Sequence, residues 1–175
     1  MTATELKKAM PDITDINIKK YMPVLNAFLP LYEINTPLRL SHFIAQVGHE
    51  TLSFKYYREI ASGVAYEGRK DLGNVQKGDG VKFKGRGAIQ VTGRSNYAEA
   101  SKFIFGDDRL LTNPELLELP EFGVKAACWF WTKHKLNLLA DTDNLIKITK
   151  KINGGTNGLD DRKRRLELAK KVFIL

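Results

Sequence analysis

Apolar and polar residues follow a helical spacing along much of this 175-residue chain, beginning near its amino terminus. Thr2 and Glu5 have the spacing of a capping box, which predicts a short helix that Pro11 ends. A second helix is expected over about residues 15–28. The first part of the chain is therefore predicted to be helical.

A third helix is predicted to start at Thr36 and Pro37, because threonine caps a first turn well and proline suits its first position. The apolar residues that follow at helical spacing are Leu40, Phe43, Ile44 and Val47. Glu50 comes three residues after the last of these, so it extends the apolar face of the helix. Apolar surroundings favour the protonated form of a carboxyl, so Glu50 is a candidate acid.

The pattern changes between residues 62 and 92, where seven glycines interrupt the chain. We expect a loop-rich segment that lines a cleft and contains small β-like pieces, such as residues 88–92. In an extended strand, Gln90 and Thr92 lie on one face, where an amide and a hydroxyl can bind a sugar or hold a water molecule. The alternative interpretation of this segment is a plain strand and turn.

Helical signals return after this segment. Asn113 followed by Pro114 predicts another helix start, and residues 121–139 form an aromatic-rich stretch typical of a central core helix. The single cysteine, Cys128, lies within that apolar stretch and is expected to be a buried thiol rather than a nucleophile.

Two more helices are predicted near the carboxyl terminus. Asp141 or Thr142 is expected to cap the first, which runs to Lys151. Asn153, followed by two glycines, either ends that helix in a left-handed turn or holds its amide in a cleft. Asp160 opens the last helix, whose expected inward residues are Leu166, Ala169, Val172 and Phe173.

The composition is that of an ordinary globular protein, with 43% hydrophobic and 27% charged residues. The predicted fold is mainly α, in a single domain over residues 1–175 with amino-terminal helices over residues 1–35 and a core over residues 36–175. We expect a monomer without a cofactor.

The formal net charge of +8 suggests a polyanionic partner: nucleic acid, an anionic membrane face or an anionic wall polymer. Nine lysines and arginines but three acidic residues occur in residues 147–175. This basic segment is either a binding surface for a polyanion or an ordinary solvated helix face.

The amino terminus lacks the apolar stretch of a signal peptide, and no segment has the roughly 18 apolar residues of a membrane span. We therefore expect synthesis in the cytoplasm without a cleaved export signal.

Glu50 and Glu59 form the main candidate pair for catalysis. Glycoside hydrolysis needs two carboxyls in unequal environments, one to donate a proton and one to activate water. Glu59 follows two tyrosines and an arginine near a polar, glycine-rich segment, which favours its anion. His42 and His49 flank Glu50, but the second histidine of a zinc-binding His-Glu-x-x-His motif is missing, so no metal site is predicted.

In fixed order over about residues 36–173, several segments closely resemble the family-19 chitinase-type glycoside hydrolases, especially the short endolysins of phages and prophages. The matching segments are His49-Glu50-Thr51, residues 65–69 and 72–74, residues 85–92, Asn96-Tyr97 and residues 152–155. The resemblance implies a lysozyme-like, two-lobed helical fold with a central cleft, and hydrolysis with inversion.

The resemblance also implies roles for individual residues. Glu50 is similar to the general acid, Glu59 to the general base, and Thr92 to the hydroxyl residue that helps to hold the attacking water. Glu67 is the alternative base. An inverting pair requires carboxyls about 6.5–9.5 Å apart. The positions implied to bind sugar or orient catalytic groups are Gln90, Asn96, Tyr97, Asn153 and Arg162, and Arg162 in particular is similar to an arginine that organises the acidic pair.

Two substrates fit this resemblance, peptidoglycan and chitin. The basic carboxy-terminal segment and the missing signal favour the glycan strands of bacterial peptidoglycan, reached in the periplasm once the inner membrane of the host is permeabilised. Muramidase activity on these strands is what the resemblance implies. The same segment is a candidate contact with an anionic outer membrane. The non-enzymatic alternative is a basic nucleic-acid-binding protein, which we do not expect because no recognised binding motif is present.

Overall fold

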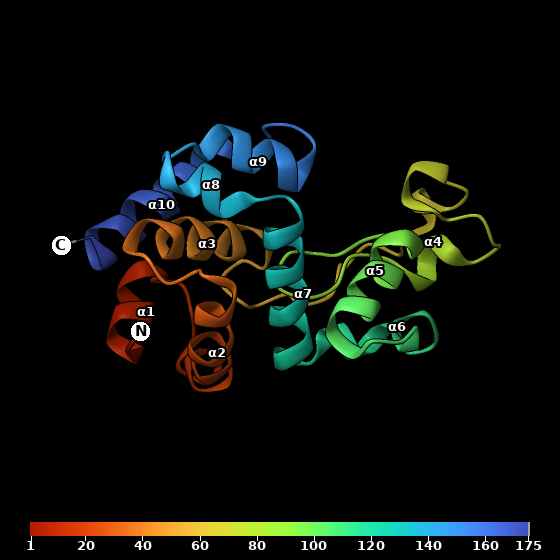
Figure 1. The fold of residues 1–175 in the computed structure, drawn as a ribbon, viewed down its shortest axis with the longest axis horizontal. Coiled ribbons are helices and arrows are strands. Elements are labelled where there is room, and N and C mark those ends of the chain that lie inside the picture. Colours follow the sequence, from red (N-terminus) through yellow and green to blue (C-terminus); the bar gives the residue numbers. More distant parts are fainter. Residues whose placement is uncertain (175) are drawn as a thin grey trace. The chain divides into compact units, whose positions relative to one another are not determined.

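The computed structural model describes residues 1–174, and its architecture is mainly helical (Figure 1). This confirms the predicted fold class. Within the described part of the chain, β-structure is limited to two isolated antiparallel bridges, Arg58 to Arg86 and Arg86 to Val91. None of the described helices is both long and apolar enough to cross a bilayer.

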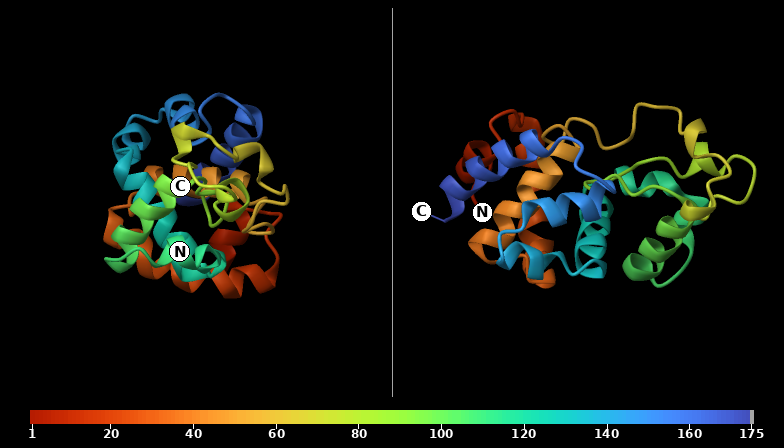
Figure 2. Two further views of the ribbon diagram at one scale, coloured as in Figure 1. Left: turned by 90° about the vertical axis from the view of Figure 1, so that its right-hand side faces the viewer. Right: turned by 90° about the horizontal axis from the view of Figure 1, so that it is seen from above.

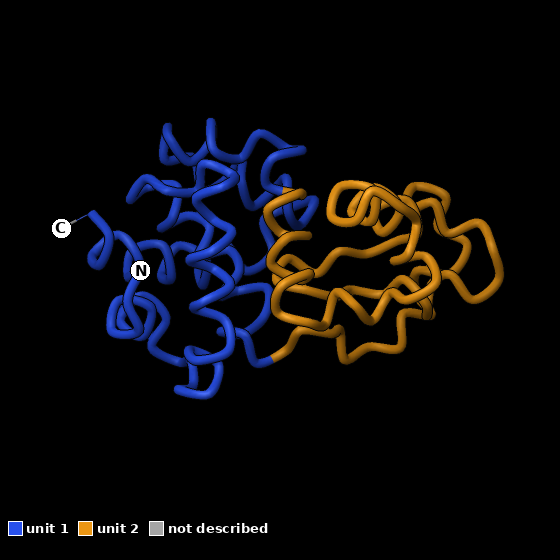
Figure 3. The backbone as a smooth tube through the Cα atoms, turned by 60° about the horizontal axis from the view of Figure 1, so that its bottom comes forward, with its two compact units in different colours: residues 1–55, 131–175 blue, residues 56–130 orange. Residues whose placement is uncertain are grey.

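The chain divides into two compact units (Figure 3). The first contains residues 1–55 and the described residues from Trp131 onward, and the second contains residues 56–130. The helices of the first unit are α1 (Ala3–Ala9), α2 (Asp15–Phe28), the 3-10 helix η1 (Leu29–Tyr32), α3 (Pro37–Glu50), α8 (Leu136–Asp141), α9 (Leu145–Asn153) and α10 (Leu159–Phe173).

In the first unit, α10 packs along α3 and also contacts α1 and α9 (Figure 1 and Figure 2). The apolar face of α3 supplies Phe43 and Val47 to the core, and Phe43 meets Trp131 edge-on with ring centroids 5.2 Å apart. Leu166 and Ala169 of α10 are buried as predicted, whereas Val172 and Phe173 are half-buried. The packing of α3 against α10 brings together residues that are more than 100 positions apart.

The predicted starts of α1 and α3 are confirmed. Thr2 and Glu5 form the capping box of α1. Thr36 caps α3 by accepting a hydrogen bond from the backbone N–H of Arg39 at 3.3 Å. At the other end of the chain, α9 ends at Asn153, and Gly154 follows in the left-handed conformation with φ of 78°.

The helices of the second unit are short, apart from α5 and α7. They are η2 (Val64–Tyr66), η3 (Lys70–Leu72), α4 (Asp79–Lys82), α5 (Arg94–Phe105), α6 (Arg109–Thr112), η4 (Pro114–Glu118) and α7 (Pro120–Lys133), whose last three residues belong to the first unit. Aromatic pairs hold this unit together, including Phe83 with Tyr97 and Phe105 with Phe122. The predicted start at Asn113 exists, but it opens only a 3-10 helix.

The single long helix predicted over residues 121–139 is wrong. It is interrupted at Lys135, which has a left-handed φ of 53°, so the chain forms α7 and α8 instead. The predicted cap of the next helix is wrong as well, because Asp141 ends α8 and Asn144 caps α9 by accepting a hydrogen bond from Lys147 N–H. Thr142 instead donates its hydroxyl back to carbonyls of α8.

The extended piece predicted over residues 88–92 is a turn. Gly87 and Gln90 both have positive φ, at 80° and 55°, and the backbone of Arg86 pairs with that of Val91 around them. Cys128 is fully buried, and burial raises the pKa of its thiol to about 12, which confirms its interpretation as a packing residue.

Candidate active site

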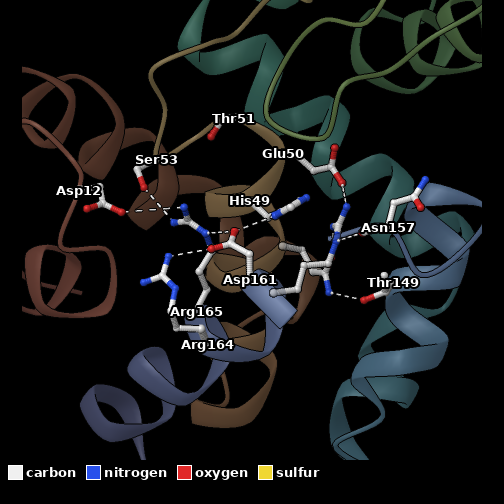
Figure 4. Close-up of polar contacts among 12 residues, drawn as sticks. Asp12, His49, Glu50, Thr51, Ser53, Thr149, Asn157, Asp161, Arg164 and Arg165 are labelled. Carbon is white, nitrogen blue, oxygen red and sulfur yellow. Dashed lines mark hydrogen bonds and ion pairs between the residues drawn. The ribbon is translucent and has the colours of Figure 1, made fainter. Parts of the chain in front are cut away.

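Glu50 is the last residue of α3, and its side chain is 16% exposed. Its Oε1 accepts a hydrogen bond from Nη2 of Arg162 on α10 at 2.5 Å (Figure 4). Its other oxygen, Oε2, has no hydrogen-bond partner among the described residues. This carboxyl thus ends the apolar face of α3, as expected, and is paired with an arginine 112 positions away.

Arg162 is fully buried, and all three of its guanidinium nitrogens have partners. Besides Glu50, Nη1 donates to Oε1 of Gln46 and Nε donates to the carbonyl of Asn157 at 3.3 Å. Gln46 in turn donates to the hydroxyl of Thr149 at 3.3 Å. An arginine cannot lose its charge in a protein, so removing its carboxylate would leave a buried cation unpaired.

The two histidines of α3 each contact an aspartate. His49 Nδ1 lies 2.8 Å from Asp161 of α10, which also accepts hydrogen bonds from Arg164 and Arg165 (Figure 4). Burial opposes ionisation of Asp161, but these partners outweigh it and hold the pKa of the carboxyl well below its usual value. His42 is fully buried beside Asp143, and burial lowers the pKa of its imidazole. Both histidines thus help to join elements of the first unit.

Glu59 belongs to the second unit and is half-buried. Its Oε1 accepts a hydrogen bond from the hydroxyl of Tyr66 at 2.8 Å, and its Oε2 accepts one from the backbone N–H of Gly85 at 3.0 Å. The backbone N–H of Glu59 also donates to the carbonyl of Gly85, at 2.8 Å, so these two residues are joined by two hydrogen bonds. Burial, together with the bond to Glu59, raises the pKa of Tyr66, which keeps this hydroxyl a donor at neutral pH.

Gly85 is the point around which three of the predicted site residues gather. A β-carbon on this residue would lie 2.8 Å from Gln90 Oε1, 3.2 Å from Glu59 Oε2 and 3.4 Å from Thr92 Oγ1. The side chains of Gln90 and Thr92 thus lie close to Gly85, as the Glu59 carboxylate does, although a turn rather than a strand brings them there. The three provide acceptor oxygens, and Thr92 adds a hydroxyl, which suits the binding of a water molecule or a sugar hydroxyl.

Glu67, the alternative base, is exposed and performs a structural task. Its two oxygens accept hydrogen bonds from the backbone N–H groups of Gly78 and Gly80, at 2.5 and 2.8 Å. These groups lie at the start of α4, where free N–H groups need an acceptor. The contacts of Glu67 therefore favour Glu59 over it as a catalytic carboxylate.

Comparison with known proteins identifies the family. The model of class I chitinases, glycoside hydrolase family 19, matches residues 36–156, well over half of the chain. The chain belongs to glycoside hydrolase family 19.

Relatives of this family-19 chain occur in bacteria and plants. A Haemophilus influenzae protein described as a glycosyl hydrolase family 19 domain-containing protein is 30% identical over 151 residues, which cover 69% of this chain and 72% of that protein. An Arabidopsis thaliana endochitinase is 34% identical over 117 residues, which cover 66% of this chain but only 39% of the plant protein. The chain thus matches less than half the length of this plant relative.

Solved structures share the lysozyme-like helical fold of the family. Chitinase C from Streptomyces griseus has a TM-score of 0.75 at 21% identity, covering 98% of this chain and 76% of that one. The class IV chitinase from Zea mays has a TM-score of 0.65 at 22% identity, covering 97% and 88%. The predicted lysozyme-like fold is thereby confirmed.

The remaining predicted site residues of this family-19 chain differ in their surroundings. Asn96 is half-buried and donates to the carbonyl of Thr92 at 2.8 Å, while Asn153 is exposed at the end of α9. The prediction that Tyr97 contacts a sugar is corrected, because this residue is fully buried and its hydroxyl donates to Lys84 O at 2.6 Å. Arg162 is too buried to touch substrate, and it contacts Glu50, as expected of an arginine that organises the acidic pair.

Sequence reasoning missed three residues that hold the two carboxyls. Gln46 lies four positions before Glu50 on the same helix, and that spacing was the signal that would have found it. Tyr66 lies within residues 65–69 and Gly85 within residues 85–92, two segments that match the family without giving either residue a role. For these two, no local pattern points to Glu59, because their contacts with it depend on the loop fold of the second unit.

Proposed function

We propose that this family-19 glycoside hydrolase cleaves β-1,4 bonds in bacterial peptidoglycan with inversion, using Glu50 as the general acid. The observation that carries the proposal is the asymmetry of the Glu50 carboxyl. One oxygen is fixed by the buried Arg162, and the other has no partner among the described residues and is left to carry a proton. After the proton passes to the leaving oxygen, the cation of Arg162 stabilises the carboxylate that forms.

Glu59 is the proposed general base that deprotonates the attacking water. It is surrounded by donors, Tyr66 and the Gly85 N–H, as a base that must be ionised requires. Thr92, whose hydroxyl lies beside the same glycine, is proposed to hold the water, and Gln90 and Asn96 to orient groups around it. Asn153 at the end of α9 is a proposed sugar contact.

The preference for peptidoglycan is supported by charge. Arg162 and Arg165 of the basic segment are buried, and Lys170 pairs with Asp143 at 2.5 Å, so these three are structural. Exposed lysines remain in the same segment, namely Lys147, Lys150, Lys151, Lys163 and Lys171. They suit a wall that carries anionic polymers, and by extension an anionic outer membrane. Action in the periplasm after permeabilisation of the inner membrane belongs to the same proposal.

Chitin is the second candidate substrate, and the comparisons favour it. Several relatives carry the name endochitinase, including those of Arabidopsis thaliana and Pisum sativum. Both polymers contain β-1,4-linked N-acetylglucosamine, so the same acid and base serve either one.

A parallel assay separates the two substrates. The purified protein is added to outer-membrane-permeabilised bacteria and to colloidal chitin, and turbidity and released sugar are followed. The proposal predicts loss of turbidity with little sugar released from chitin, and no activity from Glu50→Gln. Sugar release from chitin without lysis would contradict the proposal and identify chitin as the substrate.

A further inference from the structure

Gln46 connects the candidate acid to a second helix. It lies one turn before Glu50 on α3, so both side chains point toward α10. Gln46 is fully buried, and both ends of its amide have partners. Its Oε1 accepts from Arg162 Nη1, and its Nε2 donates to Thr149 Oγ1 of α9 at 3.3 Å.

The orientation of this amide follows from the chemistry of its neighbours. A guanidinium has donors only, so Gln46 must turn its oxygen toward Arg162. Its NH₂ group then points the other way and needs an acceptor, which the fully buried hydroxyl of Thr149 supplies. Without that acceptor, a buried donor would be left unpaired, at a cost that favours other side-chain positions.

The guanidinium is thus held at all three nitrogens. Gln46 accepts from Nη1, and the carbonyl of Asn157 accepts from Nε. Because the guanidinium is rigid and planar, these two bonds also fix the position of Nη2, which donates to Oε1 of Glu50. The acid is therefore oriented by Arg162 and Gln46, whose side chains have no exposed surface, together with the backbone carbonyl of Asn157.

We infer that Gln46 and Thr149 are positioning residues for the acid: through Arg162 they fix which oxygen of Glu50 is tied down and which is left to carry the proton. This rests on the proposed role of Glu50. Thr149 lies one turn before Asn153 on α9, so the helix that ends at the proposed sugar contact also anchors the acid. Neither Gln46 nor Thr149 touches substrate.

The kinetic test uses Thr149→Val, which keeps the size of the side chain but removes the acceptor, and Gln46→Met, which removes both ends of the amide. We expect kcat to fall on the order of 10-fold for Thr149→Val and 100-fold for Gln46→Met, with KM within about 2-fold of wild type. Thr149→Ser restores the acceptor and should recover wild-type kcat. Ser101→Ala is the matched control, because this buried hydroxyl accepts from Leu110 N–H within the second unit and has no bond to Arg162 or its partners.

A spectroscopic measurement decides the inference even if no glycan proves to be a substrate. Nitrogen-15 NMR of the arginine side chains should show separate, slowly exchanging Nη signals for Arg162 in wild type, because both Nη atoms are held. These signals should broaden or merge in Gln46→Met and stay separate in Ser101→Ala. Wild-type kcat in Thr149→Val and Gln46→Met, or unchanged Arg162 signals in Gln46→Met, would overturn the inference. Inactivity of wild type on all glycans would instead overturn the proposed function.

Discussion

Glu50 and Glu59 are held by different kinds of partner. Glu50 is held by a side chain, Arg162 on a neighbouring helix, whereas Glu59 is held by a backbone N–H and a tyrosine hydroxyl within a loop-rich unit. Substitutions around the acid therefore act through side-chain bonds. Around the base, the backbone conformation matters most. The N–H of Gly85 binds Glu59, and the side chains of Gln90 and Thr92 also lie close to this glycine.

Gly85→Ala tests the grouping around the base. The new methyl group would meet Gln90 Oε1 at 2.8 Å and Glu59 Oε2 at 3.2 Å, so both side chains must move. We expect activity to fall on the order of 100-fold, with a loss of roughly 1 kcal/mol in the free energy of unfolding. Kinetics and urea denaturation measure the two effects.

Gly106→Ala is the matched control. Gly106 has a left-handed φ of 77°, which alanine adopts only with strain, but a methyl group there meets no atom within 4 Å. Its stability should fall by a similar amount while its activity stays at the wild-type level. Equal activity in both variants would show that the side chains around Gly85 do not take part in catalysis.

For individual residues, interactions between near neighbours in the sequence were predicted well, and contacts between distant residues were not. The caps at Thr2 and Thr36 depend on residues three positions away, so the sequence contains the whole interaction. The partner of Glu50 lies 112 positions away and was suggested only by family resemblance. Tyr97 was assigned to the substrate because Asn96-Tyr97 matches a segment of the family, and nothing in the sequence indicated that Tyr97 would be buried against Phe83 and Arg86.

Among the elements, α3 and α10 form the contact on which the acid depends. Asp161 in the first turn of α10 joins them, because its carboxylate contacts His49 of α3 and two arginines of its own helix. The pKa of Asp161 is lowered in the folded protein, so it contributes stability above its unfolded value near 3.8 and loses that contribution as pH falls below it.

Asp161→Asn should therefore destabilise the protein in a pH-dependent way. At pH 7 we expect the free energy of unfolding to fall by about 1–2 kcal/mol. The difference from wild type should shrink as pH falls below about 4, because the unfolded wild-type chain then takes up a proton at Asp161 that the folded protein does not, which favours unfolding. Thermal unfolding at several pH values measures this. Asp160→Asn, which changes the neighbouring exposed aspartate, should show little difference at any pH, and equal behaviour of the two variants would refute the role of Asp161.

The order and type of the helices were largely predictable from spacing and caps, but two boundaries were not. Lys135 adopts a left-handed conformation that is uncommon for lysine, so no sequence signal marked the break between α7 and α8. The turn at residues 87–90 replaced an expected strand because Gln90 also takes a positive φ, again without a glycine at that position. Alternation of polar residues alone could not distinguish this turn from a strand.

For the whole molecule, family membership establishes a chitinase-like glycoside hydrolase, and charge supports the choice of substrate. Lys147 and Lys150 are exposed on α9, in the first unit. Changing both to glutamine should slow lysis of permeabilised cells several-fold at low salt but little at high salt, because the attraction to wall polyanions is screened. Hydrolysis of a small soluble glycan should be unchanged.

The control changes two exposed lysines on other helices of the same unit, Lys8 of α1 and Lys19 of α2, to glutamine. This lowers the net charge by the same amount as the change at Lys147 and Lys150. Slower lysis in both double variants would assign the effect to net charge rather than to α9. Full lysis by the Lys147 and Lys150 variant at low salt would remove the charge argument for peptidoglycan.

Proton NMR of the newly formed reducing ends, recorded early in the digestion of soluble peptidoglycan glycan fragments, tests the central claim most directly. The α-anomer should appear first from the β-linked substrate, since direct attack by water inverts the anomeric carbon. Glu50→Gln should yield no product while keeping its circular dichroism spectrum, because its amide oxygen can still accept from Arg162. Initial release of the β-anomer, or product formation by Glu50→Gln at the wild-type rate, would contradict an inverting mechanism with Glu50 as the acid.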